Sequence, residues 1–268
     1  MAACDAWLTR ATGTDLERHQ IQRLRHETRR RILTLTAVER LTPNMARLTF
    51  AAPDLQDFVS ASHDDHIKLF FPAPAGSDPG AKPVARDFTP RRFDTKTGAL
   101  TIDFALHEAG PATGWAASAR VGDTLEIGGP RGSSVTPDDF DWYLLIGDET
   151  ALPAIGRRVE ELRARAPVTT CVVVASEADA QQFETRAIWS PIWVTRTSRA
   201  HDAASLCAAL STFQPPPGDG FVWIAAEASV ARAMRVYMLE ERGHPRAWIK
   251  AAGYWKQGQA ETHERIED

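Results

Sequence analysis

Residues 107–116, with the sequence HEAGPATGWA, combine residue types that can hold a phosphate. They follow an alternating apolar run over residues 100–106, which is typical of a strand and which Gly110 and Pro111 interrupt. Residues 112–119 then fit a short helix. Its N-terminus would present unpaired N–H groups and a partial positive charge, which suit an anion. The alternative interpretation is a plain turn between a strand and a helix, because Gly-Pro turns are common.

Residues 86–91 (RDFTPR) form a second block of residues that suit a planar, phosphate-bearing ligand. The guanidinium of Arg86 can grip a phosphate with two N–H donors. Phe88 offers a flat face for stacking, and Thr89 offers a hydroxyl and a backbone for hydrogen bonds. The alternative is an ordinary strand with a core Phe and surface arginines.

A third block, residues 147–154 (GDETALPA), lies where a classical dinucleotide-binding chain would carry G-x-G-x-x-G, and that fingerprint is absent. Asp148 and Glu149 place two carboxylates at the expected start of a helix, where they stabilise the helix but would repel a pyrophosphate. Helix capping by Asp148 or Thr150 is therefore a serious alternative to ligand binding.

Two runs of secondary structure must position these blocks. Between residues 31 and 131, short apolar segments separated by turn sequences predict six strands, which favour an antiparallel β-barrel. After Gly132, strands and helices alternate, which indicates a parallel sheet flanked by helices. The expected barrel strands cover residues 32–38, 46–50, 67–71, 86–93, 100–106 and 124–127. The later strands cover residues 142–146, 168–175, 192–195, 221–225 and 246–251, and the helices 150–164, 203–213 and 229–242.

The chain is thus expected to contain a barrel domain over residues 31–135 and an α/β domain over residues 136–252. Residues 1–30 are polar and rich in charge, as in a solvated arm, and residues 253–268 form a tail placed to fold back over the domain interface.

The bulk properties are those of a globular protein. The chain has 268 residues, of which 43% are hydrophobic and 25% are charged. A net charge of −4 gives no reason to expect nucleic acid or an anionic membrane as a partner, and no segment approaches a membrane span. The N-terminal sequence has no signal-peptide core, so a cytoplasmic location is expected. The three cysteines make neither a metal-ligand pattern nor a disulfide framework.

Taken in order, four blocks resemble the siderophore-interacting protein family, the flavin-dependent ferric-siderophore reductases of the ferredoxin-reductase-like superfamily. They are residues 86–91, 107–116, 147–154 and the tail block 253–258 (GYWKQG). The resemblance covers roughly residues 30–260. Each block alone is weak evidence, but the four in this order are specific. The chain departs from the family's Arg-x-Tyr-Thr-x-Arg pattern at Phe88, where the missing hydroxyl removes one contact to the flavin.

The resemblance implies that the barrel binds FAD and that the flavin carries the chemistry, so no side chain is expected to act as nucleophile or acid. His107 is expected beside the flavin without a catalytic proton role, and Trp115 is expected to pack. The implied cofactor-binding residues are Arg86, Asp87, Phe88, Thr89, Asp103, His107, Gly110, Pro111, Ala112, Thr113, Asp148, Thr150, Ala151, Tyr254 and Trp255.

The expected activity is reduction of a ferric siderophore to release ferrous iron, with electrons from NADH, NADPH or a ferredoxin. Glu177 favours a free ribose diol and therefore NADH, whereas Arg196 and Arg199 favour a 2′-phosphate. Ser176 and Glu227 are further nucleotide candidates, and Lys68, Arg131 and Lys256 are expected to steer an anionic substrate. Two alternatives remain open: a general flavin or ferredoxin-type reductase with another acceptor, and a non-catalytic siderophore-binding module.

Overall fold

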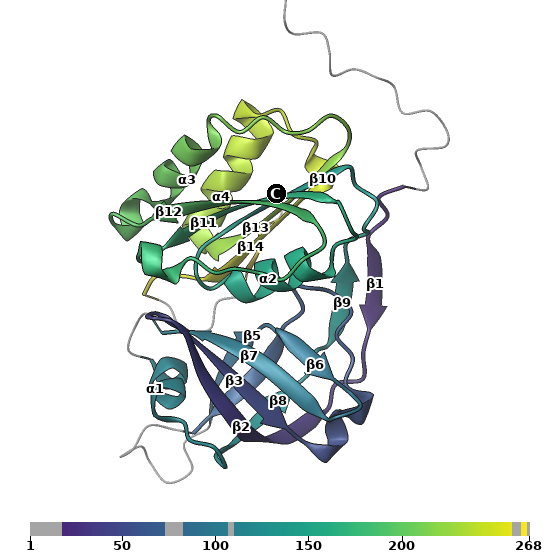
Figure 1. Cartoon of the computed structure of the whole chain (residues 1–268), viewed down its shortest axis with the longest axis vertical. Coiled ribbons are helices and arrows are strands. Elements are labelled where there is room, and N and C mark those ends of the chain that lie inside the picture. The colour runs from purple at the N-terminus through teal and green to yellow at the C-terminus, as the bar shows by residue number, and fades with distance from the viewer. Residues whose placement is uncertain (1–17, 73–82, 107–109, 259–263, 267–268) are drawn as a thin grey trace, which may run out of the picture.

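The computed structural model describes residues 18–72, 83–106, 110–258 and 264–266 of the chain. Two units lie one above the other in Figure 1: an α/β unit in green and yellow, and a curled β-sheet in purple and blue. A paired ribbon of two strands, β1 and β9, runs along one side of the molecule between them. None of the helices in the described ranges is long and apolar enough to cross a bilayer.

The curled unit is a seven-stranded antiparallel sheet in the order β5-β4-β8-β2-β3-β7-β6. Its edge strands are β5 and β6, so the described residues form an open half-barrel. Inward-facing apolar side chains alternate with more exposed ones, as β4 shows. The strands are β2 (Arg30–Thr42), β3 (Met45–Ala51), β4 (Ile67–Phe71), β5 (Val84–Phe88), β6 (Arg92–Asp94), β7 (Ala99–Ala105) and β8 (Thr124–Gly128), and α1 (Pro111–Ser118) links the last two.

The predicted class, a β-barrel followed by an α/β domain, is confirmed, but the half-barrel has seven strands rather than six. The strand expected over residues 86–93 is interrupted after Phe88 and resumes at Arg92. Pro90 has no N–H to donate to a sheet ladder, so it separates β5 from β6.

The α/β unit contains a sheet in the order β12-β11-β10-β13-β14-β15, in which only the last pairing is antiparallel. Helix α2 covers the face toward the half-barrel, and α3 and α4 cover the opposite face (Figure 1). Strand β11 is almost wholly buried, as expected for a strand in a covered parallel sheet. The elements are β10 (Trp142–Gly147), α2 (Leu152–Glu161), β11 (Pro167–Val174), β12 (Ile188–Thr195), α3 (Asp202–Leu210), β13 (Gly220–Glu227), α4 (Ala228–Val236), β14 (Ile249–Trp255) and β15 (Glu264–Arg265).

Two elements of the α/β unit differ from the sequence expectations. The last long helix, expected to reach Arg242, is α-helical only to Val236 and ends in a wider π turn over Tyr237–Glu241. Strand β14 begins at Ile249 and runs to Trp255, so Tyr254 and Trp255 belong to the sheet and not to a free tail.

The polar connector expected over residues 133–141 and the polar arm expected over residues 1–30 also contain structure. Strands β1 (Gln22–Arg25) and β9 (Gly132–Val135) pair antiparallel, and β9 is part of the chain that leads from the half-barrel into β10.

Candidate functional site

The end of the half-barrel that faces the α/β unit brings three backbone segments together. Ile67 pairs with Phe88, so Thr89 lies next to His66, one step beyond that pair. The turn at Gly129 lies against His66 on the other side, because a Cβ at Gly129 would lie 3.9 Å from the His66 carbonyl. Thr89 is buried. We call this end of the half-barrel the rim.

The two faces of β5 separate the predicted roles of its side chains. Directly paired residues of an antiparallel sheet project to the same face, so Arg86 and Phe88 share the face of their buried partners on β4. Asp87 lies on the other face, where it accepts a hydrogen bond from Lys68 at 3.0 Å. Phe88 lies 4.5 Å from the ring of Phe104, centroid to centroid.

An aromatic cluster joins the first block to helix α1. Phe71 contacts both Phe88 and Trp115, with ring centroids 6.0 and 5.9 Å apart, and Trp115 also packs on Phe50 and Phe104. Trp115 therefore packs in the half-barrel core, as the sequence predicted. The cluster lies where α1 contacts β4 and β7, and β4 is the strand paired with β5, which carries Arg86.

Helix α1 begins at an N-terminus that suits a phosphate. Gly110 is its N-cap with extended backbone, no side chain caps the first turn, and that turn contains no acid. Pro111 occupies the first helical position, where its missing N–H costs nothing. The N–H groups near Ala112 and Thr113 are therefore oriented as in an anion site. His107 lies outside the described residues.

The predicted contact at Asp103 is engaged elsewhere. Both of its carboxylate oxygens accept hydrogen bonds from Arg47 at 2.7 Å, and the side chain is buried. Because Arg47 and Asp103 are paired residues of β3 and β7, this bidentate ion pair fastens those two strands together.

Asp148 lies at the carboxyl ends of β10, β13 and β14, and it joins all three. One oxygen accepts from the Thr150 backbone at 2.9 Å and from its hydroxyl at 2.5 Å. The other accepts from the Glu227 N–H and from the Trp255 indole, each at 2.9 Å. Burial, together with the neighbouring Glu149, raises the pKa of Asp148 above its usual value. Ala151, the next predicted contact, is fully buried beneath this turn.

Arg196 forms ion pairs with acidic side chains at the carboxyl edge of the parallel sheet. It forms a bidentate pair with Glu149 at 2.5 and 2.7 Å, and its Nε donates to Asp202 at 3.0 and 2.9 Å. These bonds, which outweigh the effect of burial, raise the pKa of Arg196. The guanidinium thus balances two buried carboxylates, which accounts for how the acidic turn of the third block is tolerated.

The end of β14 connects the α/β unit to the rim. Tyr254 is hydrogen-bonded to the Thr89 side chain, and burial, together with Asp64 and Asp65, raises its pKa well above the usual value. The guanidinium carbon of Arg199 lies over the ring of Trp255, 4.9 Å from the centroid of that ring. Through these contacts the first, third and fourth blocks meet. Lys256 follows on the surface.

The other nucleotide candidates have structural partners. Ser176 and Asp179 form a capping box, and Asp179 also binds Thr42 at 2.8 Å and the Asn44 side chain at 2.8 Å, which ties the β2–β3 hairpin to the α/β unit. Glu227 caps α4 by accepting from the Ser229 N–H at 2.6 Å. Glu177 is exposed beside the capping box.

Sequence reasoning missed a buried polar cluster under Tyr254. Asp64 accepts from Trp223 Nε1 at 3.1 Å, and Lys250 Nζ lies 2.6 Å from it. Burial lowers the pKa of the adjacent His63 to about 3, so this imidazole is neutral. The residues Ser62–Asp65 stand in a polar loop before β4, and nothing in that local sequence distinguishes them from exposed residues.

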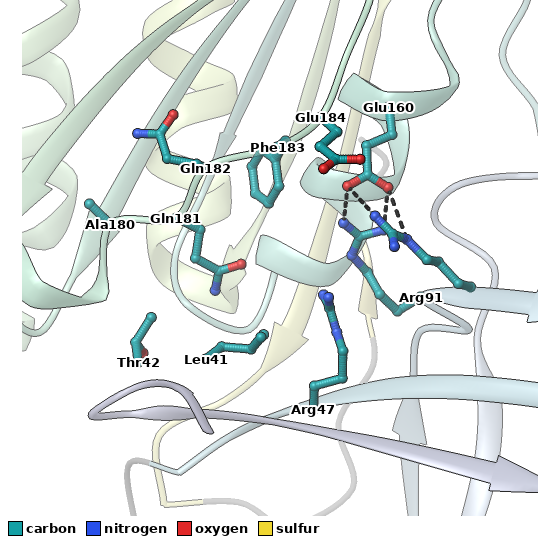
Figure 2. Close-up of a pocket in the computed structure, with 11 residues that line it drawn as sticks. Leu41, Thr42, Arg47, Arg91, Glu160, Ala180, Gln181, Gln182, Phe183 and Glu184 are labelled. Carbon is teal, nitrogen blue, oxygen red and sulfur yellow. Dashed lines mark hydrogen bonds and ion pairs between the residues drawn. The ribbon is translucent and has the colours of Figure 1, made fainter. Parts of the chain in front are cut away.

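A pocket of about 340 Å³ opens between the two units (Figure 2). Arg91 and Arg92 both grip Glu160 at its wall, and Phe183 stands above them. The alternative interpretation of residues 86–91 placed their arginines at the surface, yet the Arg91 side chain is only 1% exposed. This wall of the pocket therefore holds the half-barrel to α2. The lining residues are Leu41, Thr42, Arg47, Arg91, Arg92, Glu160, Ala180, Gln181, Gln182, Phe183 and Glu184.

The residues present fit FAD. The open N-terminus of α1 and the guanidinium of Arg86 suit its diphosphate, whereas Phe88, Thr89 and Tyr254 provide aromatic surface and hydroxyls at the rim for its ring.

Comparison with known proteins agrees with this fit. The model of the siderophore-interacting FAD-binding domain matches residues 34–80 and 75–134, and the siderophore-interacting protein model matches residues 140–258. The NADPH-dependent ferric-chelate reductase of Escherichia coli is 34% identical over 87% of this chain and 96% of its own length. The ferric vibriobactin reductase of Vibrio cholerae is 28% identical over 86% of this chain and 91% of its own.

A solved structure, a siderophore utilization protein from T. fusca, superimposes with a TM-score of 0.83 at 35% identity, covering 91% of this chain and 98% of that one. With both halves matched by the family's own models, the chain belongs to the siderophore-interacting protein family, and its half-barrel is the FAD-binding domain of that family.

Proposed function

We propose that this protein binds one FAD, non-covalently, at the rim and uses it to reduce the iron of ferric siderophores. The observation that carries the proposal is the convergence of the predicted blocks. Thr89 of the first block contacts Tyr254, and Trp255 contacts Asp148 of the third. The aromatic cluster links Trp115 of the second block, through Phe71, to Phe88 of the first. The reductase names of two relatives in the family support the same activity.

The chain's part in this reaction is binding and positioning. When bound, the flavin accepts two electrons as hydride and releases them singly. Arg86 and the start of α1 would hold the diphosphate, and Thr89, fixed by Tyr254, would help to orient the ring at the rim. Ferrous ion binds hard oxygen ligands more weakly than ferric ion does, so a single electron is enough to loosen the chelate.

The substrate approaches where basic residues border the rim. Lys68 is on β4, beside Gly128, and its side chain is 43% exposed although it pairs with Asp87. Arg131 and Lys256 are exposed on the turn after β8 and after β14. These cations attract an anionic chelate and raise its rate of encounter.

We favour NADPH as the electron donor, because the Escherichia coli relative is named for it. Arg196 is bound by Glu149 and Asp202, so we assign the 2′-phosphate to Arg199, which stands over Trp255 at the carboxyl edge of the sheet. NADH and a reduced ferredoxin remain the competing donors, and release of ferrous iron in the cytoplasm remains a prediction.

The test is anaerobic spectroscopy of the purified protein. Denaturation should release FAD, NADPH should bleach the visible flavin absorbance faster than NADH, and adding a ferric siderophore should restore that absorbance while a ferrous chelator reports iron. If no flavin is released and the apoprotein takes up none, the proposal that the protein binds FAD is wrong. Bleaching by a ferredoxin alone changes the donor, and bleaching without reoxidation by the siderophore leaves a reductase with another acceptor.

A further inference from the structure

The link between the two units is a double strand. Strand β9 lies on the chain between the end of the half-barrel and β10, and β1 pairs with it from Gln22 opposite Val135 to Arg25 opposite Gly132. Residues 18–29, called the strap below, precede both ranges matched by the family models, 34–134 and 140–258. The family resemblance therefore assigns them no role.

One end of the strap is fixed to the α/β unit by His19. Its ring stacks on Phe140 with centroids 3.8 Å apart and an interplanar angle of 13°. Nδ1 lies 2.7 Å from Asp139, Nε2 lies 3.1 Å from Asp219, and the backbone N–H donates to Asp139 at 2.9 Å. The side chain is only 7% exposed. A buried imidazole that stacks on one face and has a partner at both ring nitrogens is a firm anchor.

The other end of the strap holds the turn that carries Arg131. The His26 N–H donates to the Arg131 carbonyl at 3.0 Å, and the Gly129 N–H donates to the Arg29 carbonyl at 3.2 Å. The strap and the turn are in such close contact that a Cβ at Gly132 would lie 2.4 Å from the Leu24 carbonyl. Both sides of this turn are thus bonded to the strap backbone.

We propose that the strap is a positioning element of the substrate site, which holds Arg131 in place beside the start of β4, with His19 as its anchor. The inference rests on the proposed function, because it takes Arg131 as a substrate contact. Arg131 is followed by Gly132, and the turn before it contains Gly128 and Gly129, whose backbone freedom would otherwise have to be lost when the substrate binds. Ordering the turn beforehand lowers that cost.

The test compares removal of residues 1–26, which deletes β1 and its anchor, with removal of residues 1–17, which leaves the strap intact. His19→Ala is the milder variant. The substrates are an anionic ferric tris-catecholate and a neutral ferric tris-hydroxamate. Loss of the strap should raise KM for the anion by roughly three- to tenfold, the value of one side chain that must be ordered on binding. FAD content, kcat and the rate of flavin bleaching by NADPH should match those of the control.

Arg131→Ala separates positioning from general destabilisation. If the strap acts through Arg131, removing the strap from Arg131→Ala should leave KM for the anion unchanged, because coupled residues are not additive. Additive increases in KM, or an equal increase for the neutral substrate, would overturn the proposal. So would an unchanged KM in both strap variants.

Amide hydrogen exchange gives a readout that does not depend on activity. The Gly129 N–H, which is bonded to Arg29 here, should exchange faster in His19→Ala and in the deletion of residues 1–26, and at the control rate when only residues 1–17 are removed. Equal exchange rates of the Gly129 N–H in all variants would contradict the proposal that the strap holds this turn in place. If the unaltered protein fails to reduce both ferric complexes while exchange responds as expected, the proposed function is at fault and the strap's hold on the turn stands.

Discussion

The pair formed by Arg91 and Glu160 allows a sharp prediction about the interface. Arg91 donates to both oxygens of Glu160, at 2.8 and 2.6 Å, and the two side chains are 1% and 15% exposed. Glu160→Gln keeps the shape but removes the charge. Among the residues that the structure describes, the buried guanidinium then retains Asp103, 3.6 Å away, as its one carboxylate partner. Breaking one side of a buried ion pair costs about 3–5 kcal/mol.

We expect the lower end of that range, about 3 kcal/mol, because the amide oxygen can still accept one hydrogen bond. For a chain of this size each kcal/mol lowers the melting temperature by roughly 2–4 °C, so Glu160→Gln should lower it by about 6–12 °C. The matched control is Arg92→Ala. Arg92 bonds the same carboxylate, but its side chain is 54% exposed, so its loss should cost less than about 1 kcal/mol.

The pH dependence checks the electrostatic origin of the effect. Burial alone would raise the pKa of Glu160, but the bonds from Arg91 and Arg92 lower it below its usual value. A carboxyl group with a lowered pKa in the folded state stabilises the fold above its ordinary pKa, near 4.3, and loses that contribution as the pH falls. The gap in melting temperature between wild type and Glu160→Gln should therefore narrow below about pH 4. Equal melting temperatures of Glu160→Gln and Arg92→Ala at neutral pH would refute this reasoning.

Three further variants address the site. Arg86→Ala should lower flavin retention on a desalting column more than Arg92→Ala does, since Arg92 is bound to Glu160; equal retention would remove Arg86 from the diphosphate. Trp255→Ala should shift the visible flavin spectrum or weaken flavin retention, whereas a lower melting temperature with an unchanged spectrum would assign the ring to packing. Lys256→Glu should raise KM for an anionic ferric siderophore, more at low than at high salt, because exposed charges are screened over about 10 Å at 0.1 M. An unchanged KM of this variant at low salt would show that Lys256 does not contribute to substrate binding.

The sequence was sufficient for elements with a strong apolar pattern. Strand β4 coincides with its predicted range of residues 67–71. Strands β8 and β10 each extend one residue beyond their predicted ends, and β11 begins and ends one residue earlier than predicted. Strands β1 and β9 were not predicted, because their sequences, Gln-Arg-Leu-Arg and Gly-Ser-Ser-Val, show no alternation of apolar residues. Each of these strands forms by pairing with the other.

The burial of charged side chains was the second feature that could not be predicted from the sequence. Arg91 and Asp103 have the residue types of a surface or a ligand site, and only their partners from distant strands and helices show that they are internal. The blocks themselves could be found in sequence because glycine, proline and arginine occur at fixed offsets. The contacts of Tyr254 with Thr89, and of Trp255 with Asp148, depend on how the two units pack, which local patterns do not encode.

The hold of Asp179 on the β2–β3 hairpin has a consequence for how large chelates are handled. Together with Arg157, which donates to Ser60 at 2.8 Å and to the Pro90 carbonyl at 3.0 Å, and with the Glu160 pair, it clamps the two units along their common boundary. We therefore expect them to move as one body during turnover, without the hinge closure by which many enzymes enclose a small substrate. A bulky chelate would then have to receive its electron at the protein surface. An electron, unlike a transferred group, needs no such enclosure, so a clamped reductase can accept iron carriers of different size and shape and leave selectivity to charge.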